Sequence, residues 1–348
     1  MLIAEIPKFK KIDEKLAAKN DSANPCVSVI IPAYNAAEFI AATLDSVFSQ
    51  TFTDYETIVV NDGSPDTEAL EKVLAPYFER VIYIKQKNGG TAAARNTAIR
   101  AACGEWLAFL DGDDIWLPEY LESQISELKA KNFDLICADA EFFGERRDRY
   151  KTFMQKSPSR DEVTPENLLA AKCHIITSGT IAGRREILNA GLFDEELPRI
   201  GMEDFDLWFR LAKSGLHLGF QRRVLLKYRV RPNSLSGSNV QRAERELATV
   251  EIVRRKYSLT ESEIAASEKH FQTAIAELEV EKGKYNLTRE NFGEALENFR
   301  RANRNHQKFK YWMLQKLLKI NPKLVIKLFK KLRPGEFAFI SPESGGKN

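Results

Sequence analysis

The sequence predicts an α/β fold, with a doubly wound, mostly parallel sheet flanked by helices and a C-terminal helical extension. Short apolar runs alternate with segments of helical periodicity up to about residue 240, which is typical of parallel sheets. One of these runs, Trp106–Leu110, is continuous and bounded by Gly104 and Gly112, as expected of a strand buried on both faces. Beyond Val240 the pattern is helical almost to the end.

The apolar runs and the turn residues between them predict the order of the elements. Asp62-Gly63-Ser64-Pro65 and Asn88-Gly89-Gly90 are turn sequences that follow apolar runs and open helices. After Gly144 the pattern loosens into a connection of mixed charge. The predicted strands are 26–32, 56–62, 81–85, 106–110, 134–143 and a pair near 218–220 and 224–230, and the predicted helices end near residues 50, 79, 102, 131, 190 and 215.

The composition is that of a globular chain. Of its 348 residues 43% are hydrophobic and 29% charged, and no run of about 18 apolar residues marks a transmembrane helix. The first residues carry lysines but no secretory apolar region. The four cysteines are widely spaced and show no metal-ligand pattern, so we expect free thiols in a reducing compartment. We therefore expect a cytoplasmic protein, and no nucleic-acid partner.

The charge is distributed unevenly along the chain. The net charge is +3, yet between Asn298 and Gly335 there are twelve Lys or Arg and no acidic residue, which leaves 40 basic against 49 acidic residues elsewhere. A basic tail on an acidic body indicates a negatively charged partner for the tail. We predict four regions, which are a basic N-terminal arm (1–25), an α/β domain (26–239), a helical extension (240–335) and a flexible end (336–348).

Three carboxylates end the fourth predicted strand. Asp111, Asp113 and Asp114 follow the apolar run directly, at the carboxyl edge where open α/β sheets bind their ligands. Clustered carboxylates repel one another unless a cation lies between them, and Mg²⁺ and Mn²⁺ prefer oxygen ligands and bridge to substrate phosphates. The alternative is a solvated acidic turn that caps the helix starting near Pro118.

Residues at other strand ends are expected to share this edge. Asp62 ends the second strand, and Arg95 lies in the helix that follows the third. Because the strand ends of a doubly wound sheet meet at one crevice, Asp62 and Arg95 should lie near Asp111 and Asp113. Each residue taken singly could be an ordinary turn or surface residue, so it is their order along the chain that indicates a site.

Several short sequences form an ordered set with these residues. They are Val29–Asn35, Val59–Ser64, Asn88–Gly90 with Ala94–Asn96, Asp111–Asp114, Glu203-Asp204 and the Tyr228–Ser236 loop. Over about residues 26–238, this set resembles the family 2 glycosyltransferases of the GT-A fold. The resemblance implies inverting transfer of a sugar from a nucleotide-diphosphate donor, with Mg²⁺ or Mn²⁺ as cofactor.

The resemblance also implies roles for individual residues. Asp62 would accept a hydrogen bond from the base, usually uracil, while Asp111 would hold the ribose and Asp113 would ligate the metal. Arg95 would face the nucleotide. The nucleoside pocket would be lined by Pro32, Tyr34, Asn35 and Glu38, and a flexible loop that closes over the donor phosphates would contain Tyr228, Arg229, Ser234 and Ser236.

The other half of the reaction needs a base, because the acceptor hydroxyl must lose its proton as it attacks the anomeric carbon. Asp204 matches the family's general base, at a predicted helix start. Glu203 and Asp206 are local alternatives, and any of the three could instead serve to cap the helix. The apolar residues around them predict that this helix packs on the core in either case.

The extension ends in two basic amphipathic patterns within 308–333. Apolar residues recur at helical spacing on both sides of Asn321-Pro322, which breaks the helix, and lysines fill the polar positions. Helices of this kind suit an anionic membrane surface. The alternative is that the apolar stripe packs on the α/β domain while the lysines are solvated.

We therefore predict a metal-dependent inverting glycosyltransferase of polysaccharide or glycoconjugate assembly, peripheral on the inner face of the plasma membrane. Its donor would be a nucleotide-diphosphate sugar, with UDP favoured, and its acceptor a carbohydrate or a lipid-linked glycan. A sugar-nucleotide pyrophosphorylase is the first alternative, but it would need a Gly-rich basic loop where Pro32-Ala33-Tyr34-Asn35 stands. A non-catalytic nucleotide- or carbohydrate-binding scaffold is the second, and the joint presence of Asp62, Asp111, Asp113 and Asp204 argues against it.

Overall fold

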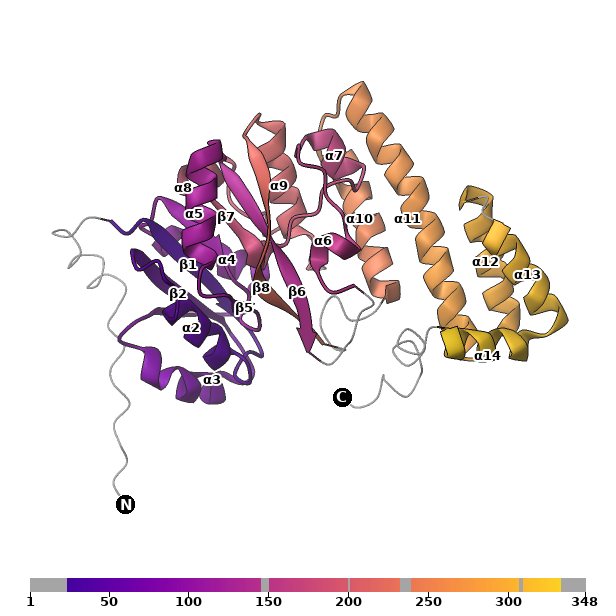
Figure 1. Ribbon diagram of the computed structural model, residues 1–348, viewed down its shortest axis with the longest axis horizontal. Coiled ribbons are helices and arrows are strands. Elements are labelled where there is room, and N and C mark those ends of the chain that lie inside the picture. The colour runs from indigo at the N-terminus through magenta and orange to yellow at the C-terminus, as the bar shows by residue number, and fades with distance from the viewer. Residues whose placement is uncertain (1–23, 145–149, 200, 232–238, 307–308, 333–348) are drawn as a thin grey trace, which may run out of the picture.

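The computed structural model describes residues 24–144, 150–199, 201–231, 239–306 and 309–332. A curled sheet with its helices makes up the larger part of the molecule, and long C-terminal helices extend from one side of it (Figure 1). The predicted end 336–348 and almost all of the predicted arm 1–25 lie outside the described residues, as do Ser234 and Ser236.

Parallel strands form the first half of the sheet, as predicted. β1 (Val27–Ala33) lies between β2 (Tyr55–Asp62) and β4 (Trp106–Phe109), and β3 (Ile82–Gln86) pairs with the far side of β2. Every residue of β1 except Pro32 is buried, because the strand is central in the sheet. The connecting helices are α2 (Ile40–Phe48), α3 (Thr67–Leu74) with a short 3-10 turn (Ala75–Tyr77), and α4 (Thr91–Ala101).

Antiparallel pairs occur in the second half of the sheet. β7 (Thr180–Gly183) is antiparallel to both of its neighbours, β4 and β6 (Leu135–Gly144). β8 (Leu218–Val230) is parallel to β6, and β5 (Ile115–Trp116) is antiparallel to β8. The strand order of the described sheet is β3-β2-β1-β4-β7-β6-β8-β5. β5 and β7 were not predicted because strands this short show no readable period.

The predicted strand pair near 218–220 and 224–230 is wrong, because both segments belong to the continuous strand β8. Gln221 pairs with Ala138 and Val224 with Asp139, so Arg222 and Arg223 form an irregularity in the ladder. Their sequence lacks the Gly, Asn or Pro that a tight turn needs, and a bulge with two exposed arginines results instead.

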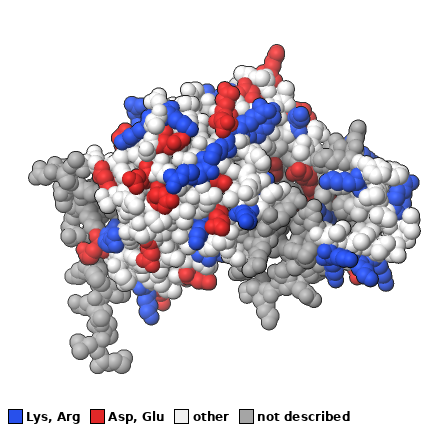
Figure 2. All heavy atoms as spheres, viewed as in Figure 1, with Lys and Arg blue, Asp and Glu red and all other residues white. Residues whose placement is uncertain are grey.

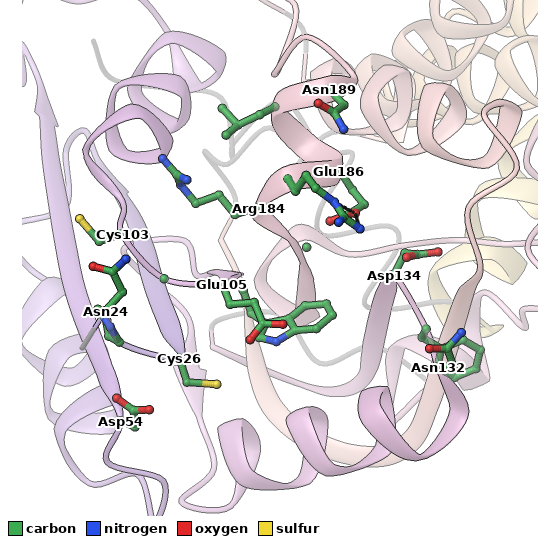
Figure 3. A pocket seen from close by; sticks show the side chains of 17 residues that line it. Asn24, Cys26, Asp54, Cys103, Glu105, Asn132, Asp134, Arg184, Glu186 and Asn189 are labelled. Atoms are coloured by element: carbon green, nitrogen blue, oxygen red, sulfur yellow. Dashed lines mark hydrogen bonds and ion pairs between the residues drawn. The ribbon is translucent and has the colours of Figure 1, made fainter.

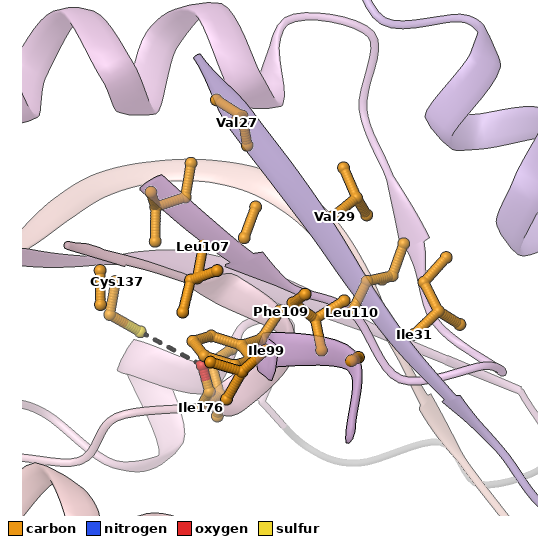
Figure 4. Close-up of a cluster of buried hydrophobic side chains, with 14 of the residues drawn as sticks. Val27, Val29, Ile31, Ile99, Leu107, Phe109, Leu110, Cys137 and Ile176 are labelled. Carbon is orange, nitrogen blue, oxygen red and sulfur yellow. Dashed lines mark hydrogen bonds between the residues drawn. The ribbon is translucent and has the colours of Figure 1, made fainter. Parts of the chain in front are cut away.

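The remaining helices of this part pack around one large core. They are α5 (Tyr120–Lys131), α6 (Phe153–Lys156), α7 (Pro165–Leu169), α8 (Arg184–Asn189) and α9 (Glu203–Lys213). Figure 4 shows side chains of β1 and β4 within the core. Trp208 of α9 lies edge-on to Phe109 and Phe193, and Trp116 stacks on Tyr120. Both tryptophans are at most 2% exposed, so they stabilise the core and are closed to a sugar.

The C-terminal helices have a smaller core of their own. They are α10 (Asn239–Lys256), α11 (Glu261–Thr288), α12 (Phe292–His306), α13 (Phe309–Ile320) and α14 (Pro322–Leu332), so the predicted break at Asn321-Pro322 is confirmed. Phe299 of α12 packs against Gly283 of α11 so closely that a Cβ there would lie 2.9 Å from the ring. Leu169, Phe209 and Val253 join α7, α9 and α10 in a third apolar cluster, which attaches the extension to the α/β part.

The cysteines and the helices bear on the expectations of free thiols and of no transmembrane helix. All four cysteines are free, Cys137 and Cys173 being buried and Cys26 and Cys103 partly buried. Among the described residues, no helix has both the length and the apolar character needed to span a membrane.

Candidate active site

The loops after β1 and β2 are tied together at the carboxyl edge of the sheet. The backbone N–H of Asn35 donates to Ser64 Oγ at 2.7 Å, and that of Ala37 donates to Asp66 Oδ2 at 2.9 Å. Asn35 has a φ of 50°, a left-handed conformation that asparagine tolerates better than most residues. These contacts place the first loop beside the second, as the parallel topology predicts.

Asp62 joins the end of β2 to the turn before α4. Its Oδ1 accepts hydrogen bonds from Gly89 N and Gln86 Nε2, and its Oδ2 accepts one from Gly90 N, each at 2.8 Å. The close approach of this turn also explains Gly63, where a Cβ would lie 2.6 Å from Asn88 N at a φ of +61°. Asp62 thus organises the turn, and Oδ2 keeps a lone pair for a further donor.

The residues predicted to line a nucleoside pocket surround this edge. Pro32 is partly buried at the end of β1, whereas Tyr34, Asn35 and Glu38 are exposed. The Tyr34 side chain is 51% exposed, so an aromatic face is open to solvent beside Asp62's loop. The role of these residues in lining a nucleoside pocket stays a prediction.

The three carboxylates of the acidic turn have different environments. Asp111 accepts a hydrogen bond from Arg95 Nη2 at 2.7 Å and is partly exposed. Asp113 forms an ion pair with Arg231 Nη2 at 2.7 Å, and burial together with Asp111 raises its pKa. Asp114 is buried, and burial followed by the charges of Asp113 and Asp111 raises its pKa well above the ordinary value. Asp114 is thus a structural residue, while the side chains of Asp111 and Asp113 are partly exposed, at 35% and 20%.

Arg95 links the acidic turn to the start of α9. Its guanidinium is almost completely buried and donates to Asp111 Oδ1 at 2.7 Å and to Glu203 Oε1 at 2.9 Å. The two carboxylates neutralise the buried cation, and the cation holds two segments far apart in sequence at one place. Its predicted role in facing the nucleotide stays a prediction.

The 3-10 turn Thr177–Gly179 is a second link between the same segments. Ser178 Oγ accepts a hydrogen bond from Asp111 N at 3.1 Å, and Thr177 Oγ1 donates to Asp204 Oδ2 at 2.9 Å. The turn is itself anchored, because Trp116 Nε1 donates to the carbonyl of Ser178 at 2.8 Å. These residues were not predicted to belong to the site, and the available signal was a pair of hydroxyl side chains directly after the apolar residues Ile175-Ile176.

Asp204 lies at the start of α9 with a perturbed carboxyl group. Its Oδ1 accepts a hydrogen bond from Phe205 N at 2.7 Å, and the residue as a whole is partly buried. Burial and, next, the charge of Glu203 raise its pKa to about 6, against the lowering effect of Arg95 and Thr177. A carboxylate with a pKa near neutrality has the protonation behaviour that a general base needs.

The two alternatives to Asp204 are engaged elsewhere. Glu203 is paired with Arg95, and Asp206 is completely buried. Asp206 accepts hydrogen bonds from Arg210 Nε at 2.9 Å, Lys256 Nζ at 2.7 Å and Tyr257 Oη at 2.6 Å. Its carboxylate therefore joins α9 to α10 inside the protein and has no route to a substrate, which favours Asp204.

Replacement of Asp206 by alanine is expected to lower the free energy of unfolding by about 3 kcal/mol, because it leaves Lys256 and Arg210 without their buried counter-charge. Urea denaturation followed by circular dichroism measures the change. The matched control is Asp161→Ala, whose carboxylate is 95% exposed in its pair with Arg222 and should leave the unfolding midpoint in place. Equal midpoints for Asp206→Ala and wild type would show that the network does not hold the helices.

The predicted location of Tyr228 and Arg229 in a flexible loop is wrong, because both belong to β8. Arg229 N donates to Asp114 Oδ1 and its Nε to the carbonyl of Asp113, both at 2.8 Å. Its guanidinium lies between the rings of Phe39 and Phe143, at 4.6 and 4.3 Å from their centroids. These contacts hold Arg229 in place, and it is Arg231, missed by sequence analysis, that reaches the Asp113 carboxylate.

The carboxylates fit a divalent cation bound together with a diphosphate. Magnesium-type sites use one or two protein carboxylates and complete their coordination with phosphate oxygens and water. Asp113 provides one such carboxylate beside the partly exposed Asp111, and in this structure the guanidinium of Arg231 is the cation paired with Asp113. No group of three or more His, Cys, Asp or Glu suited to a metal exists among the described residues, so the protein by itself would not form a complete cation cage.

A large hollow lies at the opposite, amino edge of the sheet (Figure 3). Its volume is about 880 Å³, and residues that line it include Cys26, Glu105, Trp106, Asp134 and Arg184. These residues lie at or near the starts of β1, β4, β6 and α8, away from Asp111 and Asp204. The hollow is therefore separate from the candidate active site.

Sequence comparisons identify relatives for the α/β part. Residues 28–192 match the model of the family described as Glycosyl transferase family 2. An Escherichia coli protein named UDP-Glc:alpha-D-GlcNAc-diphosphoundecaprenol beta-1,3-glucosyltransferase WfgD is 32% identical over 225 residues, which cover 63% of this chain and 83% of that protein. An uncharacterized glycosyltransferase of Rickettsia felis is 33% identical over 214 residues, 59% of this chain, and the match spans only 34% of that longer protein.

Solved structures share the fold at low sequence identity. The mannosyltransferase PcManGT of Pyrobaculum calidifontis, in complex with GDP-Man and Mn²⁺, has a TM-score of 0.62 at 18% identity and covers 92% of this chain and 86% of its own. Residues 1–349 of Staphylococcus aureus TarS, in complex with UDP-GlcNAc, have a TM-score of 0.56 at 17% identity, and the match covers 81% of this chain and 91% of the TarS chain.

Proposed function

Because this chain belongs to glycosyltransferase family 2 and has the GT-A fold, we propose that it transfers a sugar, with inversion, from a nucleotide-diphosphate donor to an acceptor hydroxyl. The observation that carries the proposal is the double link between the acidic turn and Asp204. Arg95 joins Asp111 to the start of α9, and the Thr177–Gly179 turn joins Asp111 to Asp204. These contacts hold the acidic turn, which would bind the donor, and Asp204, which would be the base, together at one edge of the sheet.

The donor would lie along the carboxyl edge. Tyr34 would stack on the base, Asp62 Oδ2 would accept its N–H, and Asp111 would hold the ribose. Asp113 would ligate Mg²⁺ or Mn²⁺, which when bound stabilises the charge that gathers on the departing nucleoside diphosphate. UDP is favoured as the nucleotide, since the E. coli relative is named for a UDP-glucose donor, while the Pyrobaculum mannosyltransferase was solved with GDP-Man.

The acceptor would react beside Asp204. As the acceptor oxygen forms its bond to the anomeric carbon, the bond from that carbon to the diphosphate oxygen breaks and the acceptor proton passes to Asp204. Attack from the face opposite the leaving group inverts the anomeric carbon. Glu203 and Arg95 would hold this helix start in position throughout.

We also propose a carbohydrate or lipid-linked glycan as the acceptor, in polysaccharide or glycoconjugate assembly. The name of the E. coli relative specifies a diphosphoundecaprenol-linked acceptor, which supports the lipid-linked class. Such an acceptor would place the protein in the cytoplasm, peripheral on the inner face of the plasma membrane.

The direct test is calorimetric titration of the protein with UDP and with GDP, each with and without Mn²⁺, followed by a turnover screen with the matching sugar nucleotides. Metal-dependent binding of one nucleotide and release of that nucleotide in the presence of an acceptor are expected. Folded protein that binds neither nucleotide would contradict the proposal.

The activity is expected to rise with pH around 6, because Asp204 must be ionised to accept a proton and its pKa lies at about 6. A plot of log kcat/KM against pH should climb below this value and level off above it. Thr177→Val removes the O–H that stabilises the Asp204 carboxylate, so it should move the midpoint upward. Thr180→Val, whose hydroxyl donates to the Ile176 carbonyl, is the matched control. A profile that Thr177→Val leaves unmoved would argue against Asp204.

A further inference from the structure

The helices α13 and α14 carry apolar side chains that are exposed in the part of the chain that the structure describes. In α13 these are Phe309, 72% exposed, Trp312, Met313 and Ile320, 80% exposed. In α14 they are Leu324, Leu328 and Leu332, at i, i+4 and i+8, so they form one stripe along the helix. Phe309 and Trp312 stack on each other with their centroids 5.4 Å apart.

The exposed stripes are distinct from the faces that hold these helices in the protein. Leu318 of α13 and Val325 of α14 are buried in the cluster formed with Phe299 and Leu287 of the preceding helices. Tyr311, Leu314 and Phe329 pack against the same cluster. The apolar faces predicted from sequence are therefore divided. One part packs on α11 and α12, rather than on the sheet, and the other faces solvent.

Lysines flank the exposed stripes. Lys323, Lys327, Lys330 and Lys331 are all exposed on α14, and Lys310, Lys316 and Lys319 on α13. The segment Phe309–Leu332 contains no acidic residue. Figure 2 shows the blue side chains gathered over α14 at the lower right of the molecule. Lys316 lies 5.6 Å from the centre of the Trp312 ring, so charge and apolar surface adjoin.

We propose that these exposed faces of α13 and α14 form a docking surface for an anionic lipid bilayer. Apolar side chains would enter the boundary between headgroups and acyl chains, with the aromatic pair at the interface, and the lysines would meet the lipid phosphates. Charge complementarity favours a bilayer over a second copy of the chain, because two such surfaces would bring like charges together. The attachment does not depend on the activity proposed above.

Flotation of the full-length protein with vesicles tests the proposal. Vesicles of equal parts phosphatidylglycerol and phosphatidylcholine should carry the protein at about 50 mM salt, where charge attraction is strong, and pure phosphatidylcholine should carry much less. The double variant Phe309→Ser with Ile320→Ser should lose at least about tenfold in the partition coefficient, because both side chains are exposed and would leave water on binding. Lys323→Gln with Lys327→Gln should lose roughly fivefold for each lysine.

Matched control variants show whether vesicle binding depends on this surface or on any exposed apolar or basic side chain. Ile264→Ser removes a 49% exposed apolar side chain from α11, and Lys129→Gln with Lys131→Gln removes two exposed charges from α5, so both variants should bind as wild type does. Circular dichroism confirms that each variant is folded.

Failure of wild type to float with anionic vesicles would overturn the proposal, as would binding that the α13 and α14 variants leave unchanged. Concentration-dependent dimers without lipid, abolished by the same variants, would assign the surface to a second copy instead. UDP titration of the variants reports separately on the proposed activity.

Discussion

Asp204→Asn is expected to reduce kcat by about a thousandfold while leaving the affinity for UDP unchanged. Asparagine keeps the shape of the carboxylate, and its oxygen can still accept the hydrogen bond from Phe205 N. The Thr177 hydroxyl can rotate and accept from the new amide, so the start of α9 should keep its structure. What is lost is the ability to take up the acceptor proton. Steady-state turnover, with the sugar nucleotide and acceptor established for wild type, measures the effect.

The neighbouring residue provides the control for this experiment. Glu203→Gln keeps a hydrogen-bond acceptor for Arg95. It should lower kcat only a few-fold, because the substitution weakens a single charge-assisted hydrogen bond. If Glu203→Gln shows the large loss and Asp204→Asn the small one, the base is Glu203. If Asp204→Asn also abolishes UDP binding, Asp204 holds the donor site together rather than acting on the acceptor.

Asp113→Asn is expected to weaken metal-dependent UDP binding by roughly two orders of magnitude, since losing a direct ligand costs at least as much as losing an outer partner. The amide oxygen is a poor ligand for a hard cation, and the ion pair with Arg231 is lost with the charge. Calorimetric titration with UDP at fixed Mn²⁺ measures the change. Binding in the absence of metal should change little.

Asp114→Asn is the matched control for Asp113→Asn. The Asp114 carboxyl is buried and its pKa is raised well above the ordinary value, so a neutral amide of the same shape should replace it with little effect. Its oxygen can still accept the hydrogen bond from Arg229 N. A large loss of UDP binding in Asp114→Asn with none in Asp113→Asn would reverse the two roles assigned here.

The sequence by itself determined the family and the alternating order of strands and helices, and it predicts the carboxyl edge as the place of the site. These follow from local patterns. Apolar runs of strand length, glycine-containing turns such as Asn88-Gly89-Gly90 and acidic residues directly after Trp106–Leu110 are all visible over a few residues. Parallel topology then brings strand ends together without further information.

Only the tertiary structure decided which partners the acidic residues have, because those partners are distant in sequence. Asp206 is buried and bound by Lys256, the last residue of α10, and by Tyr257 directly after it, and Glu203 is engaged by Arg95. Burial, which no sequence pattern reports for a single carboxylate, separates Asp114 from Asp113. The helical pattern of α14 likewise predicted an apolar face, but which of its side chains meet the protein and which meet solvent was decided by how the helices pack.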